Sequence, residues 1–219
     1  MSEFLTIDSD VDDGVDVELE VKRSRFLTRL RRVTSEETAR AVIDEQRSRF
    51  FDARHHCSAF VLGAEGRAAR SSDDGEPAGT AGVPMLNVLT SNHLTDVVAV
   101  VTRYFGGIKL GAGGLVRAYS EAVAHAVATV GTRRVELCTL LGIDADFANI
   151  GTLENSLRGA VLTSGVNVTV EGVDWGDRAR ITVAVPVTAT GEFNSFLSAL
   201  SAGSLTAHPT GQRWVDRLG

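Results

Sequence analysis

Apolar and polar residues alternate along residues 15–33, and the pattern changes to a helical spacing directly afterwards. A period of two residues is typical of half-buried strands, so we predict one or two strands here. Thr34 followed by Glu37 has the spacing of a capping box and predicts the start of a helix over residues 35–50. Residues 56–62 (HCSAFVL) then predict another strand.

Residues 97–101 (VVAVV) form an unbroken β-branched run of the kind found in strands that are covered on both faces. This central strand leads into the glycine segment, defined as residues 103–117, and then into a helix that reaches about residue 130. Gly131 stands where a left-handed C-cap is expected. Residues 67–82 are rich in turn-forming types, and we predict a long polar loop there.

The pattern starts again after Gly131, with strands predicted at 135–143, 166–173, 180–187 and 204–215, and with helices at 147–160 and around Phe193 to Leu200. The order β-α-β-β-α-β is the ferredoxin-like arrangement, which places two helices on one face of an antiparallel sheet. We therefore predict an α+β protein with an acidic flexible tail (1–14), an N-terminal domain (15–132) and a ferredoxin-like C-terminal domain (133–219).

The 219 residues, of which 43% are apolar, suffice to bury real cores, and no apolar run approaches the roughly 20 residues of a membrane span. Cys57 and Cys138 are the only cysteines, too few for a disulfide framework. We expect free thiols and a cytoplasmic protein.

Charge is distributed unevenly around the net value of −6: residues 1–20 hold eight acidic side chains and no basic one, whereas residues 21–60 hold ten basic against five acidic. The chain can therefore offer a local anion-attracting face although it is acidic overall. One interpretation is a solubilising tail followed by a solvated helix face. Another is that the flexible tail folds over the basic surface and competes with nucleic acid for its cations.

The glycine segment is the strongest candidate site, because its glycines open a helix whose first N–H groups can bind phosphate or carboxylate. The glycines are Gly106, Gly107, Gly111, Gly113 and Gly114. Three cations, Arg103, Lys109 and Arg117, and two possible stacking partners, Tyr104 and Tyr119, accompany them. The alternative is that the glycines only permit tight packing and the tyrosines belong to the core. The segment matches neither the P-loop nor the Rossmann fingerprint.

The acidic loop at 71–82 brings Asp73, Asp74 and Glu76 together. Such carboxylates can hold Mg²⁺, but we favour salt bridges to the arginines of the glycine segment or plain turn chemistry. His55, His56 and Cys57 suggest zinc, yet strand neighbours point to opposite faces, so we interpret them as structural. No nucleophile set can be assembled; we expect no metal, no cofactor and no catalysis.

Four stretches together resemble the YigZ/IMPACT family: KRSRF at 22–26, HC at 56–57, SDDGEPAGTAGVPML at 72–86 and VTRYFGGIKLGAGGLVRAYS at 101–120. The resemblance implies an N-terminal domain with the fold of the second domain of a small-subunit ribosomal protein, which is shared with elongation factor G. It also implies that the C-terminal domain is similar to the last domain of that factor.

The family's eukaryotic members act in translational control during amino-acid starvation by binding a partner of an eIF2α kinase, and its bacterial members are suspected nucleic-acid binders. With the resemblance, we expect RNA or ribosome binding in a cleft lined by Arg103, Lys109, Arg117 and the basic stretch 22–54, with a role in translation or stress response. Lys22, Arg23 and Arg25 of this stretch join the glycine segment as candidate binding residues. Two alternatives stay open: an enzyme that binds a phosphorylated ligand, and a protein-interaction adaptor.

Overall fold

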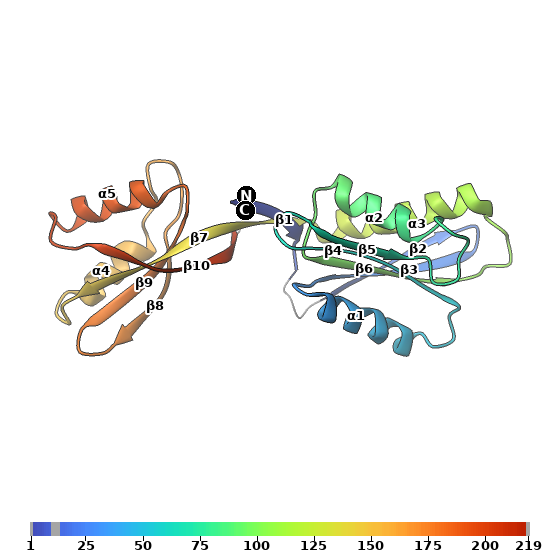
Figure 1. Ribbon diagram of the computed structural model, residues 1–219, viewed down its shortest axis with the longest axis horizontal. Helices are drawn as coiled ribbons and strands as arrows, with labels where there is room; N and C mark the ends of the chain where they lie inside the picture. The colour runs from blue at the N-terminus through green and yellow to red at the C-terminus, as the bar shows by residue number, and fades with distance from the viewer. Residues whose placement is uncertain (1, 10–13, 218–219) are drawn as a thin grey trace. The chain divides into compact units, whose positions relative to one another are not determined.

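The computed structural model describes residues 2–9 and 14–217, and its contacts divide the chain into two compact units. Unit 1 comprises Glu3–Arg134 and unit 2 comprises Val135–Arg217. Each unit combines an antiparallel sheet with helices, which confirms the α+β prediction (Figure 1). Within the described residues, no helix has both the length and the apolar composition that crossing a membrane requires.

The sheet of unit 1 has the order β2-β3-β6-β4-β5. Its strands are β2 (Gly14–Val21), β3 (Ser24–Arg32), β4 (His55–Leu62), β5 (Ala68–Ser72) and β6 (Val97–Tyr104). The alternation in residues 15–33 is confirmed as the hairpin of β2 and β3. The β-branched run lies in β6, which pairs with β3 and β4 and is buried as far as Arg103, as expected of a central strand.

Helices cover both faces of this sheet (Figure 1). Helix α1 (Glu36–Arg49) packs on one face over Val98 and Val100, whereas α2 (Gly82–Ser91) and α3 (Gly111–Val130) cover the other. The capping box of α1 is formed by Ser35 and Thr38, one residue later than predicted. Strand β5 was also missed; it is an edge strand with mostly exposed side chains and therefore carries no apolar alternation.

The N-terminus differs from the flexible tail that its acidity predicts. Residues Glu3–Ile7 form strand β1, in which Phe4 is buried and Ile7 is 0% exposed. The carbonyl of Leu5 accepts a hydrogen bond from the Thr95 N–H at 2.9 Å. Burial of these apolar side chains offsets the entropy of ordering, so the flexible-tail prediction is wrong for this strand. Residues 10–13 lie outside the described residues.

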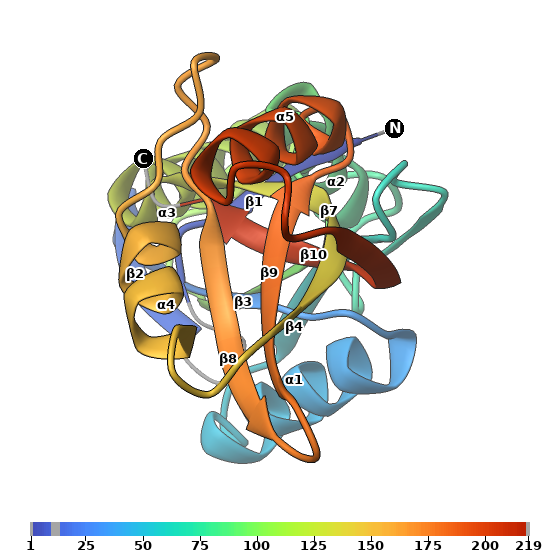
Figure 2. The ribbon, with the colours of Figure 1, turned by 90° about the vertical axis from the view of Figure 1, so that its left-hand side faces the viewer.

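Unit 2 contains β7 (Thr132–Ala145), α4 (Ile150–Arg158), β8 (Thr169–Trp175), β9 (Ala179–Pro186), α5 (Thr190–Leu200) and β10 (Ala207–Arg217). Its strands have the order β10-β7-β9-β8, and β8 and β9 run side by side in Figure 2. Alternate residues of β7 and β9 share one apolar cluster with Leu157 of α4 and Phe193 of α5. Both helices therefore cover one sheet face, as the ferredoxin-like prediction requires.

Candidate functional site

The turn between β2 and β3 lies directly against the glycine segment. Lys22 and Arg23 form this two-residue turn with φ values of 49° and 66°. The N–H of Gly106 donates to the Ser24 hydroxyl at 3.2 Å, and a Cβ at Gly106 would lie 2.0 Å from the carbonyl carbon of Arg23. Only glycine permits so close an approach. Two of the predicted basic segments, far apart in sequence, are therefore adjacent.

Helix α3 begins at the end of the glycine segment without a side-chain cap. Gly111 is its first residue and has a φ of 73°, a conformation that other residues adopt only with strain. The N–H groups of a first helical turn have no intrahelical partners and carry a partial positive charge. Lys109, exposed just before the helix, adds a formal charge, so an anion at this position remains our prediction.

A hollow of about 580 Å³, here named the glycine-loop hollow, opens at the start of α3. The side chains that line it include cations, two aromatic rings and aliphatic groups: Arg54, Arg103, Lys109, Tyr104, Phe105 and Leu115. Its size falls within the range of about 300–1,000 Å³ that is usual for small-ligand sites. Arg117, by contrast, is exposed on α3 and does not line the hollow.

Several exposed cations of the hairpin turn, the glycine segment and the segment before β4 have no ion-pair partner among the described residues. In the described part of the chain, no ion pair or side-chain hydrogen bond involves the five exposed cations Lys22, Arg23, Arg54, Lys109 and Arg117. Arg25 differs, because its guanidinium donates to both oxygens of Glu18 at 2.6 and 3.0 Å. The two lysines of the sequence are both among these five. All five cations can therefore bind an anionic ligand without first breaking an ion pair inside the protein.

A buried ion pair forms the floor of the hollow. Arg103 donates to Glu76 at 2.7 Å, and the Tyr119 hydroxyl donates to the same oxygen at 2.8 Å. The salt bridge expected between the acidic loop and the glycine segment is thus confirmed, through Glu76. Tyr119 is 0% exposed, and burial raises its pKa, so it is a core residue and the prediction that it stacks on a ligand is wrong.

The other two carboxylates of the acidic loop bind backbone N–H groups. Asp73 accepts from Gly79, Ala81 and Gly82 at 2.7, 3.0 and 2.8 Å. Burial would raise the pKa of Asp73, but these three hydrogen bonds outweigh it and lower the pKa. Asp74 accepts from the His56 N–H at 2.6 Å and from Arg47 at 2.9 Å.

The hydrogen bonds from backbone N–H groups to Asp73 and Asp74 agree with the turn interpretation of this loop. Among residues 2–9 and 14–217, no three His, Cys, Asp or Glu side chains are placed to hold a metal ion.

The predicted structural role of the adjacent histidines and cysteine agrees with their contacts. His56 is buried with its Nε2 3.1 Å from the Phe50 carbonyl, and desolvation lowers its pKa. The Cys57 thiol donates to the Asp73 carbonyl at 3.0 Å, and burial raises its pKa to about 12. A thiol with so high a pKa is not a nucleophile at neutral pH.

The sequence reasoning missed Phe105. This side chain is 58% exposed, lines the hollow, and has the Arg103 guanidinium over its ring at 5.8 Å. Tyr104 beside it is half-buried; its hydroxyl donates to Asp52 at 2.7 Å, which raises the pKa of Tyr104. Phe105 stands at the exit of β6, directly before two glycines, and that position was the signal that could have identified it.

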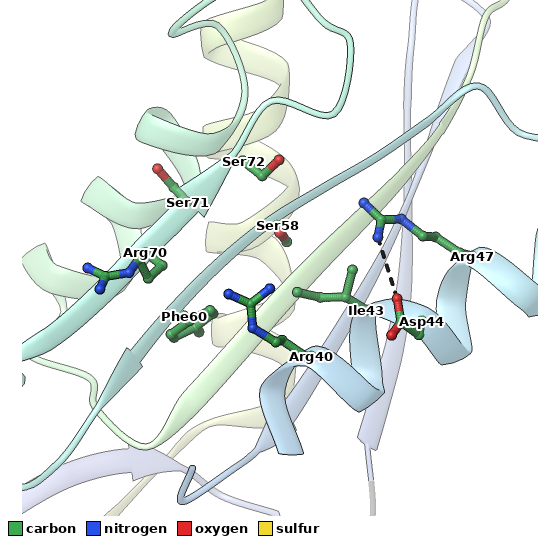
Figure 3. Close-up of a pocket in the computed structure, with 9 residues that line it drawn as sticks. All are labelled: Arg40, Ile43, Asp44, Arg47, Ser58, Phe60, Arg70, Ser71 and Ser72. Carbon is green, nitrogen blue, oxygen red and sulfur yellow. Dashed lines mark hydrogen bonds and ion pairs between the residues drawn. The ribbon is translucent and has the colours of Figure 1, made fainter. Parts of the chain in front are cut away.

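A second hollow, of about 270 Å³, lies between α1, β4 and β5 (Figure 3). Arg40 and Arg47 of α1 and Arg70 of β5 line it. Because α1 and α3 cover opposite faces of the sheet, Arg40 and Arg47 do not join the glycine-loop hollow. The expectation that the whole basic stretch 22–54 lines one cleft is therefore wrong: of its cations, Arg54 lines the hollow, and Lys22 and Arg23 lie at the turn beside Gly106.

Comparison with known proteins places this arrangement in a family. The profile of the Impact N-terminal domain matches residues 22–127, which contain the hairpin, the acidic loop and the glycine segment. The IMPACT family member YvyE of Bacillus subtilis is 37% identical over 186 residues, covering 85% of this chain and 83% of the relative. The chain belongs to the IMPACT family.

A second family member and one solved structure are also similar to most of this chain. The family member YigZ of Escherichia coli is 38% identical over 191 residues, covering 85% of this chain and 89% of YigZ. A solved structure described as a crystal structure of a hypothetical protein is 35% identical and has a TM-score of 0.60, covering 96% of this chain and 98% of its own. The likeness to IMPACT proteins thus extends over both units.

Proposed function

We propose that this protein binds RNA, free or within the ribosome, and regulates translation without catalysing a reaction. The binding surface consists of the hairpin turn at Lys22 and Arg23, the start of α3 with Lys109, and the neighbouring Arg54 and Arg117. The observation that carries the proposal is the backbone approach of Gly106 to Arg23, which places the turn of Lys22 and Arg23 beside the glycine segment that holds Lys109.

Electrostatics supports an RNA ligand. Phosphate groups of nucleic acid are bound mainly by Lys and Arg side chains and by helix N-termini, and both are present here. An exposed cation without an internal partner can bind a phosphate without breaking an existing ion pair. A paired arginine such as Arg25 would first have to give up its salt bridge with Glu18. A role in translation is consistent with the control of translation attributed to eukaryotic members of the family.

The test is a binding titration of a labelled RNA at two salt concentrations with the full chain. We expect affinity to fall steeply with salt, because bound cations displace counterions from the RNA. The double variant R23A/K109A should reduce the slope of log K against log salt by about 1.4–1.8, or about 0.7–0.9 for each lost phosphate contact. The matched control R40A/R70A, on the other sheet face, should leave the slope unchanged.

A second candidate, an enzyme acting on a small phosphorylated ligand, is favoured by the opening of α3 onto a hollow of about 580 Å³. Thermal stabilisation of the protein by ATP with Mg²⁺, without salt-dependent RNA binding, would favour that candidate. If neither ligand binds, the adaptor alternative takes the place of both.

A further inference from the structure

Phe105 is an exposed aromatic ring held in a fixed orientation. Its neighbour along β6, Arg103, is bound by Glu76 at 2.7 Å and is only 7% exposed, so its guanidinium cannot move freely. That guanidinium lies 5.8 Å from the centroid of the Phe105 ring, which is a cation–π contact. The ring is therefore preorganised at the mouth of the hollow although 58% of its surface remains in water.

A large exposed ring among unpaired cations differs from an ordinary surface side chain. Burial of an aromatic side chain is favourable, and most of the Phe105 side chain is still in water. A ligand that covers the ring would therefore gain this free energy of burial on binding. Two cations that line the hollow, Lys109 and Arg54, attract phosphate. The two carboxylates in the lining are already engaged, Asp52 by the Tyr104 hydroxyl and Glu76 by Arg103. A ligand that combines a flat aromatic group with nearby phosphates satisfies both features, and this combination describes a nucleotide.

We infer that the glycine-loop hollow takes one unpaired base of single-stranded RNA, stacked on Phe105, with the flanking phosphates at Lys109 and Arg54. This inference rests on the RNA binding proposed above and names the form of RNA. In a duplex, both faces of every internal base are covered by neighbouring bases, so only an unpaired base can stack on the ring. The phosphate contacts alone would not distinguish the two forms.

The test compares two probes of about ten nucleotides, a length within the site sizes of about 4–16 nucleotides that single-strand binding folds cover. One probe is single-stranded oligoadenylate and the other is the same strand paired with oligouridylate. Fluorescence anisotropy titrations use the full chain and the variants F105A and F105L. The matched control is I108A, because Ile108 is exposed in the same loop but does not line the hollow.

We expect the full chain to bind the single strand more tightly than the duplex. F105A and F105L should each weaken single-strand binding by about tenfold or more, from the stacking energy of a base on an aromatic ring. F105L retains an apolar side chain, so a loss in both variants identifies the π face rather than bulk. I108A should stay within about twofold, and the salt slope should stay unchanged in all three, since no cation is removed.

Two outcomes overturn the inference while the proposed function stands: equal affinity for duplex and single strand, or unchanged single-strand affinity in both Phe105 variants. Absence of salt-dependent binding to either probe overturns the proposed function itself and this inference with it.

Discussion

A single oxygen of Glu76 accepts hydrogen bonds from both Arg103 and Tyr119, and it does so where water is almost excluded. A buried charge is tolerated only when it is paired, because its desolvation costs several kcal/mol. Glu76 therefore decides whether Arg103 can remain under the glycine segment and hold Phe105.

Replacement of this carboxylate should be costly. We expect E76A to lower the free energy of unfolding by about 3–5 kcal/mol, since it leaves Arg103 buried without a counter-charge. The matched control is E18A, which removes the exposed partner of Arg25 and should cost at most about 1 kcal/mol. Urea denaturation of both variants measures the difference; comparable losses would mean that the Arg103 pair is not what stabilises this floor.

The Cys57 thiol should make the free energy of unfolding fall as pH rises in the alkaline range. Its pKa rises from an ordinary 9.0 to about 12 in the folded chain, so the folded form keeps the proton that the unfolded form releases. Stability from this group is complete below about pH 9 and is lost as pH rises toward 12, at about 1.4 kcal/mol per pH unit. In denaturation measurements between those pH values, the free energy of unfolding of C57A should fall with pH less steeply than that of the unchanged chain, by about 1.4 kcal/mol per pH unit. Equal slopes for the two proteins would refute the assignment.

The residue types of the acidic loop and the glycine segment predicted which kinds of interaction occur there, but not which residue makes each of them. The carboxylates of the acidic loop were expected to pair with arginine, but the spacing could not tell that Glu76, rather than Asp73 or Asp74, reaches Arg103. Tyr119 was expected to be accessible to a ligand, and Phe105 was missed, for the same reason: whether a ring points inward depends on how α3 packs and where β6 ends. Such tertiary information is absent from local spacing.

At the scale of elements, the contact between the β2–β3 turn and the glycine segment is the most sensitive to substitution. We expect G106A to destabilise the protein by about 1–3 kcal/mol, because its new Cβ would lie 2.0 Å from the backbone of Arg23 and the turn would have to move. RNA affinity should fall as well, since Lys22 and Arg23 would be displaced.

Gly113 supplies the control for this substitution. It lies in the first turn of α3 and a Cβ there would meet nothing within 4 Å, so G113A should be neutral or stabilising by about 0.5–1 kcal/mol. Thermal melting of both variants gives the comparison. A destabilised G113A, or an unaffected G106A, would contradict the role given to this close approach.

Helices and strands with a strong periodic pattern of apolar residues could be predicted from the sequence. Strands that are defined mainly by their pairing with a neighbouring strand could not. Strand β6 followed from its β-branched run, and the end of α3 at Val130 followed from Gly131. Strand β5 was missed because its residues AARSS are polar and lie at the sheet edge. Strand β1 was missed because its surroundings are acidic, although Phe4 and Ile7 are enough to anchor it.

At the scale of the molecule, each unit has its own core and its own chromophores. Both tryptophans, Trp175 and Trp214, belong to unit 2, whereas Tyr104 and Tyr119, the two tyrosines, belong to unit 1. Tryptophan fluorescence therefore reports on unit 2, and circular dichroism reports on the whole chain.

These signals allow the two cores to be weakened separately. Leu157 and Leu30 are each fully buried, in unit 2 and unit 1 respectively, so either leucine-to-alanine change should cost about 2–5 kcal/mol. We expect L157A to lower the denaturation midpoint of the tryptophan signal while RNA affinity stays unchanged. L30A should instead lower the midpoint of the dichroism signal and weaken RNA binding. If L157A lost RNA affinity and L30A did not, the RNA-binding surface would have to be assigned to unit 2.

The position of Lys22 and Lys109 has a chemical consequence. They are the only lysines in the sequence, so its side-chain primary amines are these two. A crosslinker that reacts with these lysine side chains will therefore capture a neighbour through the hairpin turn or the loop before α3. Acylation of the same two amines would remove two positive charges from this surface and leave the twenty arginines untouched.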